Sequence, residues 1–166
     1  MGPHFLERLF APKSVAVFGA SERENSVGGR VFENLLAGGF EGEIYPINPK
    51  YETLRGRRCY PDLGRVGAPV DVAVIATPAA TVPGILQQCG EHRVRAAVIH
   101  SAGFAEAGAH GRELEREVLS LAQRFRIRVL GPNCLGLMRP SARFNATFSK
   151  SAARAGPLAL ISQSGA

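Results

Sequence analysis

The sequence predicts an α/β fold built on a doubly wound, mostly parallel sheet, and two observations support this class. Short apolar runs recur along the 166 residues, at Ser14–Phe18, Glu43–Ile47, 71–76, 96–100 and Arg128–Leu130. Each is too short for a helix, and nearly continuous apolar runs are typical of strands buried on both faces of a parallel sheet. Helical patterns separate most of these runs. Such alternation predicts right-handed βαβ units with helices on both faces of the sheet.

The first of these strands leads into a glycine-rich loop and then a helix. A polar loop over 19–26 precedes Gly28 and Gly29, after which Val31 and Leu35 recur at helical spacing. The N–H groups of the loop and the positive end of the helix would face one small region, which suits a phosphate. The alternative is that the two glycines only let the helix pack close to its strand.

Further helices are expected near the N-terminus and between the later strands. A short helix is expected at Phe5–Phe10. Another is expected at 82–92, where Thr81 is a natural N-cap and Pro83 is tolerated in the first turn. The clearest helical pattern spans 112–125. Its apolar residues form one stripe, which contains Leu114, Val118, Leu121, Ala122 and Phe125.

The C-terminal part of the sequence is less regular. Residues 137–157 read as irregular, although 144–148 could pair as one arm of a hairpin. The apolar run at 158–162 predicts a sixth strand. We therefore expect one domain over 1–157 and the start of a following, truncated α/β domain at 158–166, so that the chain is a fragment or one domain of a longer protein.

Composition and charge narrow the possible ligands. The sequence is 45% apolar and 20% charged, as in soluble globular domains, and no apolar run approaches the ~20 residues of a membrane span. Three cysteines, far apart and odd in number, disfavour a disulfide framework or a metal site and favour a reducing cytoplasm. The net charge of +6 predicts an anionic partner. Because the basic residues are dispersed, we expect a small polyanion rather than nucleic acid.

The predicted topology places the ligand at one edge of the sheet. In open parallel sheets, ligands lie at the carboxyl ends of the strands, near the point where the strand order reverses. This predicts one pocket, lined by residues 19–29, 48–50, 76–78, 101–104 and 131–134.

Two details indicate which nucleotide this pocket would take. The G-x-G-x-x-G pattern of NAD-binding domains is absent, because Gly19 is followed by a longer loop. NAD-binding domains also place an acid at the end of the second strand, whereas this sequence has Asn48, Pro49 and Lys50 there. A cation at that point attracts a phosphate on the ribose, which predicts coenzyme A or NADP. The alternative for Lys50 is a solvated surface lysine.

Several segments resemble one known family. "SVAVFGAS", "VGGRVFENLLAGGFEGEIYPINPK", "DVAVIATPA", "VIHSAGF" and "VLGPNCLGLM" are similar to the CoA-binding domain of the NDP-forming acyl-CoA synthetases. The same domain forms the N-terminal part of the succinyl-CoA synthetase alpha subunit and occurs in Pat-type GNAT acetyltransferases. The resemblance implies a Rossmann-like fold and extends from about residue 10 to the end of the sequence.

The resemblance also implies which residues bind CoA. The phosphates would lie near the first loop and helix, the adenine near the third strand, and the pantetheine near the last turn. The expected cofactor-binding residues are Gly19, Ala20, Ser21, Val27, Gly28, Arg30, Asn48, Pro49, Lys50, Ala76, Thr77, Pro78, Ser101, Ala102, Gly103 and Asn133. For Asn133, bracing of the turn is an equally open interpretation. His100 is interpreted as a structural histidine.

The function expected from these observations is binding of CoA or acyl-CoA, with the chemistry supplied by other domains or subunits. The parent would be an ADP-forming acid–thiol ligase or a GNAT acetyltransferase, and no catalytic residue is assigned within this chain. Two alternatives remain, an NADP-binding oxidoreductase domain and a stand-alone regulatory module that binds CoA or another nucleotide.

Overall fold

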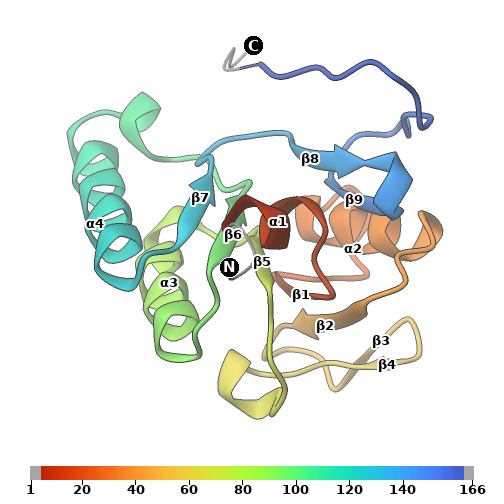
Figure 1. Ribbon diagram of the computed structural model, residues 1–166. Coiled ribbons are helices and arrows are strands. Elements are labelled where there is room, and N and C mark those ends of the chain that lie inside the picture. Colours follow the sequence, from red (N-terminus) through yellow and green to blue (C-terminus); the bar gives the residue numbers. More distant parts are fainter. Residues whose placement is uncertain (1–4, 163–166) are drawn as a thin grey trace.

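The computed structural model describes residues 5–162 and confirms the predicted α/β class (Figure 1). Its central sheet is parallel, with the strand order β2-β1-β5-β6-β7. The strands are β1 (Ser14–Phe18), β2 (Glu43–Ile47), β5 (Val72–Ile75), β6 (Ala96–Ile99) and β7 (Arg128–Leu130). Because β2 lies on one side of β1 and the later strands lie on the other, the order reverses between β1 and β5.

Side chains of the inner strands alternate between two cores. From β1, Ala16 and Phe18 face one core, while Val15 and Val17 face the other. All residues of β1, β5 and β6 are buried, which explains why these strands read as continuous apolar runs.

The helices divide between the two faces, as Figure 1 shows. Helices α3 (Val82–Glu91) and α4 (Ala109–Phe125) cover one face, where the apolar stripe predicted for α4 packs against the core. The other face is covered by α1 (Phe5–Phe10), α2 (Val27–Ala37) and a terminal hairpin. Short 3-10 turns are η1 (Leu63–Arg65), η2 (Ala79–Thr81), η3 (Ala105–Ala107) and η4 (Pro140–Ala142).

Two helix starts differ from the prediction. Thr81 precedes α3, but its side chain does not cap the helix; its hydroxyl instead donates to the Pro78 carbonyl at 2.7 Å. The N-cap residue is in the helical region, so its side chain cannot fold over the first turn as an extended N-cap residue does. Helix α4 begins at Ala109, earlier than the predicted residue 112.

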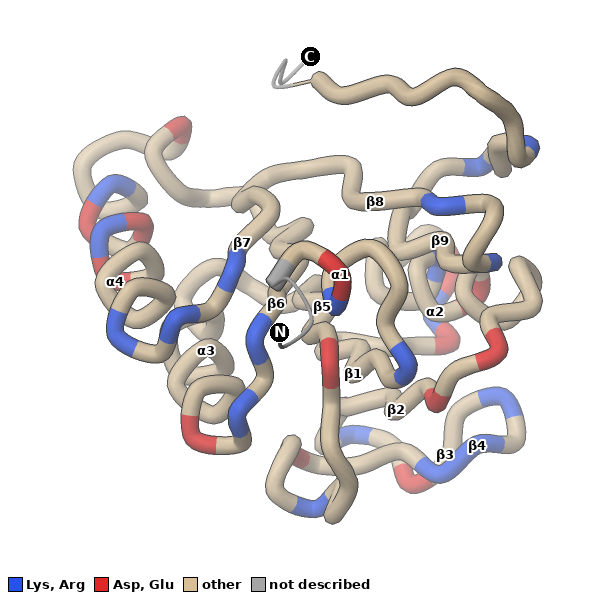
Figure 2. Tube along the Cα trace, in the orientation of Figure 1, with Lys and Arg blue, Asp and Glu red and all other residues tan. Residues whose placement is uncertain are grey.

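Two small hairpins extend the domain. The first joins β3 (Thr53–Leu54) to β4 (Arg57–Arg58), and Figure 2 shows that basic residues gather there while others are dispersed over the molecule. The second pairs β8 (Gly136–Arg139) with β9 (Phe144–Thr147), which confirms the expected hairpin arm. This hairpin packs on α2, where the Asn34 amide donates to the carbonyls of Thr147 at 2.8 Å and Ser149 at 2.9 Å.

The predicted sixth strand at 158–162 does not form. These residues have no sheet partner, and Figure 1 shows the segment running away from the sheet. Leu158, Leu160 and Ile161 are each more than 90% exposed. An apolar run forms a strand only where a neighbouring strand accepts its hydrogen bonds, and the central sheet ends at β2 and β7. The remaining residues of this expected domain, 163–166, lie outside the described part of the chain.

Candidate functional site

A cleft of about 510 Å³ opens where the strand order reverses, at the carboxyl ends of β1 and β5. The loops that leave these two strands touch at its floor. Gly19 has a φ of +82°, and a Cβ at this position would lie 2.5 Å from the Ala76 carbonyl oxygen. Glycine is therefore required there both for the backbone conformation and for the close approach.

Most of the predicted binding residues meet at this cleft, although they come from separate parts of the sequence. The cleft is lined by the predicted residues Gly19, Ser21, Val27, Gly28, Asn48, Pro49, Lys50, Ala76, Thr77 and Pro78. The loops after β1, β2 and β5 and the first turn of α2 thus enclose one common space.

One wall of the cleft is the N-terminal end of α2. Ser26 is the N-cap, and its hydroxyl accepts from the Gly29 N–H at 3.1 Å. The N–H groups of Val27 and Gly28, which also border the cleft, have no acceptor within the helix. A Cβ on Gly28 would lie 2.0 Å from the Gly19 carbonyl oxygen. The close packing of helix on strand, which was the alternative interpretation, is therefore present, and it brings the helix end to the cleft.

The segment after β2 forms the facing rim. The Asn48 amide donates to the Ala20 carbonyl at 2.8 Å, and its oxygen accepts from the Lys50 N–H at 3.0 Å. Asn48 therefore holds the two loops together. The Lys50 side chain is exposed, and no carboxylate of residues 5–162 lies within ion-pairing distance of its ammonium group.

Two predicted residues of the first loop and helix do not line this cleft. Ala20 is fully buried beneath it. Arg30 borders a neighbouring depression of about 330 Å³, where its guanidinium pairs with Glu33 at 3.1 Å. Arg55 approaches the same carboxylate at 3.7 Å. Arg30 follows Gly28 by two residues, so its side chain projects from nearly the opposite side of α2 and is directed away from the cleft.

The expected single pocket does not extend to the loops after β6 and β7. Ser101, Ala102, Gly103 and Asn133 are absent from the cleft lining, because β6 and β7 lie beyond β5 in the sheet. These residues nevertheless lie beside one another, since the Asn133 N–H donates to the Ser101 carbonyl at 3.0 Å. They form a second group of residues at the same edge of the sheet.

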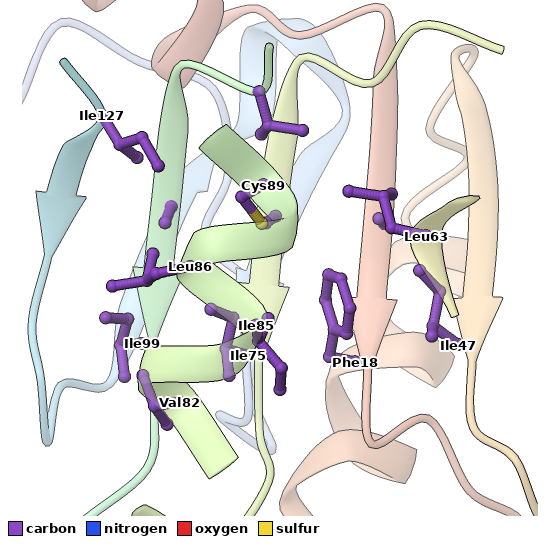
Figure 3. Packing of buried hydrophobic residues seen from close by; sticks show 14 of the residues in the cluster. Phe18, Ile47, Leu63, Ile75, Val82, Ile85, Leu86, Cys89, Ile99 and Ile127 are labelled. Atoms are coloured by element: carbon purple, nitrogen blue, oxygen red, sulfur yellow. The ribbon is translucent and has the colours of Figure 1, made fainter. Parts of the chain in front are cut away.

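Several lining residues were not predicted from the sequence. The Tyr51 hydroxyl lies 3.3 Å from Ser21 Oγ, and Pro61 and Asp62 complete the rim together with Arg23, which falls within the predicted loop 19–29. Thr81, Ile85 and Gln88 line the side formed by α3. Their spacing of four and three residues places them on one helical face, which is the sequence signal that could have identified them. Figure 3 shows Phe18, Ile85 and Ile47, which also line the cleft, in a row near the ends of the strands.

The side chains beyond the cleft support the interpretation of His100 as structural. His100 is buried, and its Nδ1 lies 3.0 Å from the Cys134 carbonyl oxygen. Burial lowers the pKa of His100, while the backbone carbonyls of Cys134 and Ala146 oppose this effect. Burial also raises the pKa of the Cys134 thiol. Both groups are therefore neutral near pH 7.

Two further classes of site are absent from the described residues. No described helix is long and apolar enough to cross a membrane. Within residues 5–162, no cluster of three or more histidine, cysteine or acidic side chains could hold a metal ion.

Comparison with known proteins relates this geometry to a family. Residues 13–140 match the family described as CoA binding domain. The chain is 46% identical over 161 residues to the ADP-forming acetate–CoA ligase I of Archaeoglobus fulgidus, covering 97% of this chain and 23% of that protein. It is 43% identical over 165 residues to the alpha subunit of the ADP-forming acetate–CoA ligase I of Pyrococcus furiosus, covering 97% of this chain and 36% of the subunit.

Solved structures show the same relation. The dinucleotide forming acetyl-coenzyme A synthetase 1 of Ca. Korarchaeum cryptofilum, in complex with phosphate and ADP, superposes with a TM-score of 0.82 at 45% identity. The superposition covers 86% of this chain and 30% of that one. The chain thus spans about a third or less of the length of these relatives. It belongs to the CoA-binding domain family, in the form found in ADP-forming acyl-CoA synthetases.

Proposed function

We propose that this chain binds coenzyme A in the cleft between β1 and β5, as the CoA-binding part of an ADP-forming acyl-CoA ligase. One observation carries the proposal. The cleft has the N-terminal end of α2 on one wall and Lys50 on the facing rim, where Asn48, Pro49 and Lys50 rather than an acid directly follow β2 and where the ammonium group has no ion-pair partner among residues 5–162. This arrangement favours a nucleotide with a diphosphate and a phosphorylated ribose over NAD.

Each part of CoA has a place in this arrangement. The diphosphate lies against the first-turn N–H groups of Val27 and Gly28, where the helix dipole favours negative charge. The ribose 3′-phosphate lies near Lys50. The pantetheine arm leaves the cleft past Pro78 toward Ser101 and Asn133, which lie farther along the same edge of the sheet.

The chemistry would occur outside this domain. In the whole ligase, the CoA thiolate attacks the carbonyl carbon of an acyl phosphate, so that a C–S bond forms and the C–O bond to phosphate breaks, releasing inorganic phosphate. This chain binds CoA and orients the thiol, whereas the remaining domains or subunits supply the acyl phosphate. By itself the chain should not catalyse turnover. We place the ligase in the cytoplasm, where its three free cysteines would remain reduced.

A thermal-shift titration of the chain with CoA, dephospho-CoA, NADP and NAD tests the proposal. We expect the largest rise in melting temperature with CoA, a smaller rise with dephospho-CoA, and little effect of NAD, because at equal concentration the ligand that binds more tightly stabilises the folded state more. A larger effect of NADP than of CoA would instead support an oxidoreductase domain. No shift with CoA would refute the proposal.

A further inference from the structure

We propose that Gln88 recognises the adenine base of CoA at the α3 side of the cleft, and that this side chain gives the site its preference for adenine. The inference rests on the proposed function, because it concerns the same ligand. It adds a residue that selects the base, whereas the helix end and Lys50 recognise only phosphates.

The α3 side of the cleft offers apolar surface of the kind against which a purine packs. Ile85, which is buried, and Pro61 border it with apolar surface. Helix α3 packs against η1, so that Asp62 and Gln88 line the same region. A flat aromatic base buries its faces against apolar side chains and presents its polar edge to a small number of hydrogen-bonding groups.

Gln88 is the polar group in this region that lacks partners. Its Oε1 is covered by protein, yet it has no hydrogen-bond partner among residues 5–162. A covered polar atom without a partner is unfavourable, and such groups in folded proteins call for an explanation. The neighbouring polar groups are already engaged. The Asp62 carboxylate accepts from the Arg65 N–H at 3.0 Å, and the Thr81 hydroxyl donates to the Pro78 carbonyl.

The chemistry of a carboxamide matches one edge of adenine. Adenine presents the N6 amino group as a donor next to a ring nitrogen that accepts, and the carboxamide presents an acceptor next to a donor. Rotation about the last side-chain bond of Gln88 exchanges the positions of Oε1 and Nε2, so either group can be turned toward the base. Guanine presents a carbonyl oxygen in place of the amino group, so it cannot form the same pair of hydrogen bonds.

The test uses a base-modified ligand, 1,N6-etheno-CoA, in which a ring joins N1 to the N6 nitrogen and removes the amino donor. Dissociation constants for CoA and etheno-CoA are measured by calorimetry with the full chain and with Gln88→Leu. We expect the unchanged chain to bind CoA about tenfold more tightly than etheno-CoA, as for the loss of one or two hydrogen bonds. In Gln88→Leu, CoA should bind as weakly as etheno-CoA, so that the preference disappears.

Gln87→Leu is the matched control. Gln87 is the preceding residue of α3, is exposed, and donates to Glu91 at 3.0 Å away from the cleft. This variant should keep the full preference for CoA. Gln88→Met provides a second variant of similar size should the leucine variant fail to fold; its side chain offers no hydrogen-bonding group to N6 and the ring nitrogen, so its preference should also be lost.

The outcomes of this test distinguish a failure of the role proposed for Gln88 from a failure of the proposed CoA binding. Equal affinity of the unchanged chain for both ligands, or an undiminished preference in a folded Gln88 variant, would overturn the role of Gln88 while CoA binding itself stands. If the unchanged chain bound neither ligand, the proposed function would fail, and this inference with it.

Discussion

The exposed ammonium group of Lys50 leads to a quantitative prediction about affinity. We expect Lys50→Ala to weaken CoA binding about tenfold. A hydrogen bond to a charged group contributes about 1.5–3 kcal/mol, and about 1.4 kcal/mol corresponds to a factor of ten. The lower end of this range applies, because Lys50 is exposed and water and salt screen its charge.

The assay compares CoA with dephospho-CoA, so that loss of the contact with the 3′-phosphate can be distinguished from a general disturbance of the cleft. Calorimetric titration should show that Lys50→Ala weakens CoA but leaves dephospho-CoA nearly unchanged, because only CoA carries the 3′-phosphate. Arg57→Ala is the control, since Arg57 is an exposed cation on β4 that does not line the cleft. An equal loss for both ligands, or no loss for CoA, would refute the assignment of Lys50 to the ribose phosphate.

Two further predictions concern stability. Gly28→Ala should lower the free energy of unfolding in urea by about 1–3 kcal/mol and weaken CoA binding, because its Cβ would lie 2.0 Å from a backbone oxygen. Gly84→Ala, on the open side of α3, should instead raise stability by up to about 1 kcal/mol. Equal stability of the two variants would contradict this. Burial lowers the pKa of His100 below its ordinary value of 6.5, so the unfolded chain binds a proton more readily and stability should fall as the pH drops below about 6.5. Urea unfolding at pH 7.5 and 5.5 measures this difference in the free energy of unfolding. An equal difference in His100→Asn would exclude His100 as its source.

The central sheet was predictable because its inner strands, β1, β5 and β6, are buried on both faces. Residues such as Val15 and Ala16 pack into different cores, so neither position tolerates a polar side chain, and the apolar run is visible in the sequence. The small hairpin of β3 and β4 has no such signal. Its strands have two residues each, and the turn depends on the positive φ of Arg55 and Gly56.

The wrong prediction of a strand at 158–162 has the same physical origin. An apolar run indicates that a segment favours burial, but it does not indicate whether a neighbouring strand is present to bury it. Leu158 and Leu160 illustrate this, because they alternate as in a strand and yet are exposed.

Some residues of the site could likewise be predicted from the sequence, whereas others could not. Gly19 and Lys50 could be predicted because they follow strands directly, and parallel strands bring such positions to one edge. Arg30 and Gln88 could not be placed correctly, because the direction of a helical side chain depends on how the helix rotates against the sheet. That rotation is set by contacts such as Gly28 on Gly19, which are formed by the tertiary structure.

The attachment of the terminal hairpin to α2 has a mechanical consequence. Through Asn34, one helix holds the backbone at Thr147 and Ser149, just before the chain leaves the body of the domain. The opposite end of that helix borders the cleft. We therefore expect a force on the segment after Ser149 to act through α2, as one rigid element, on the end of the helix that borders the cleft. A phosphate bound tightly at that end would in turn resist the movement of α2.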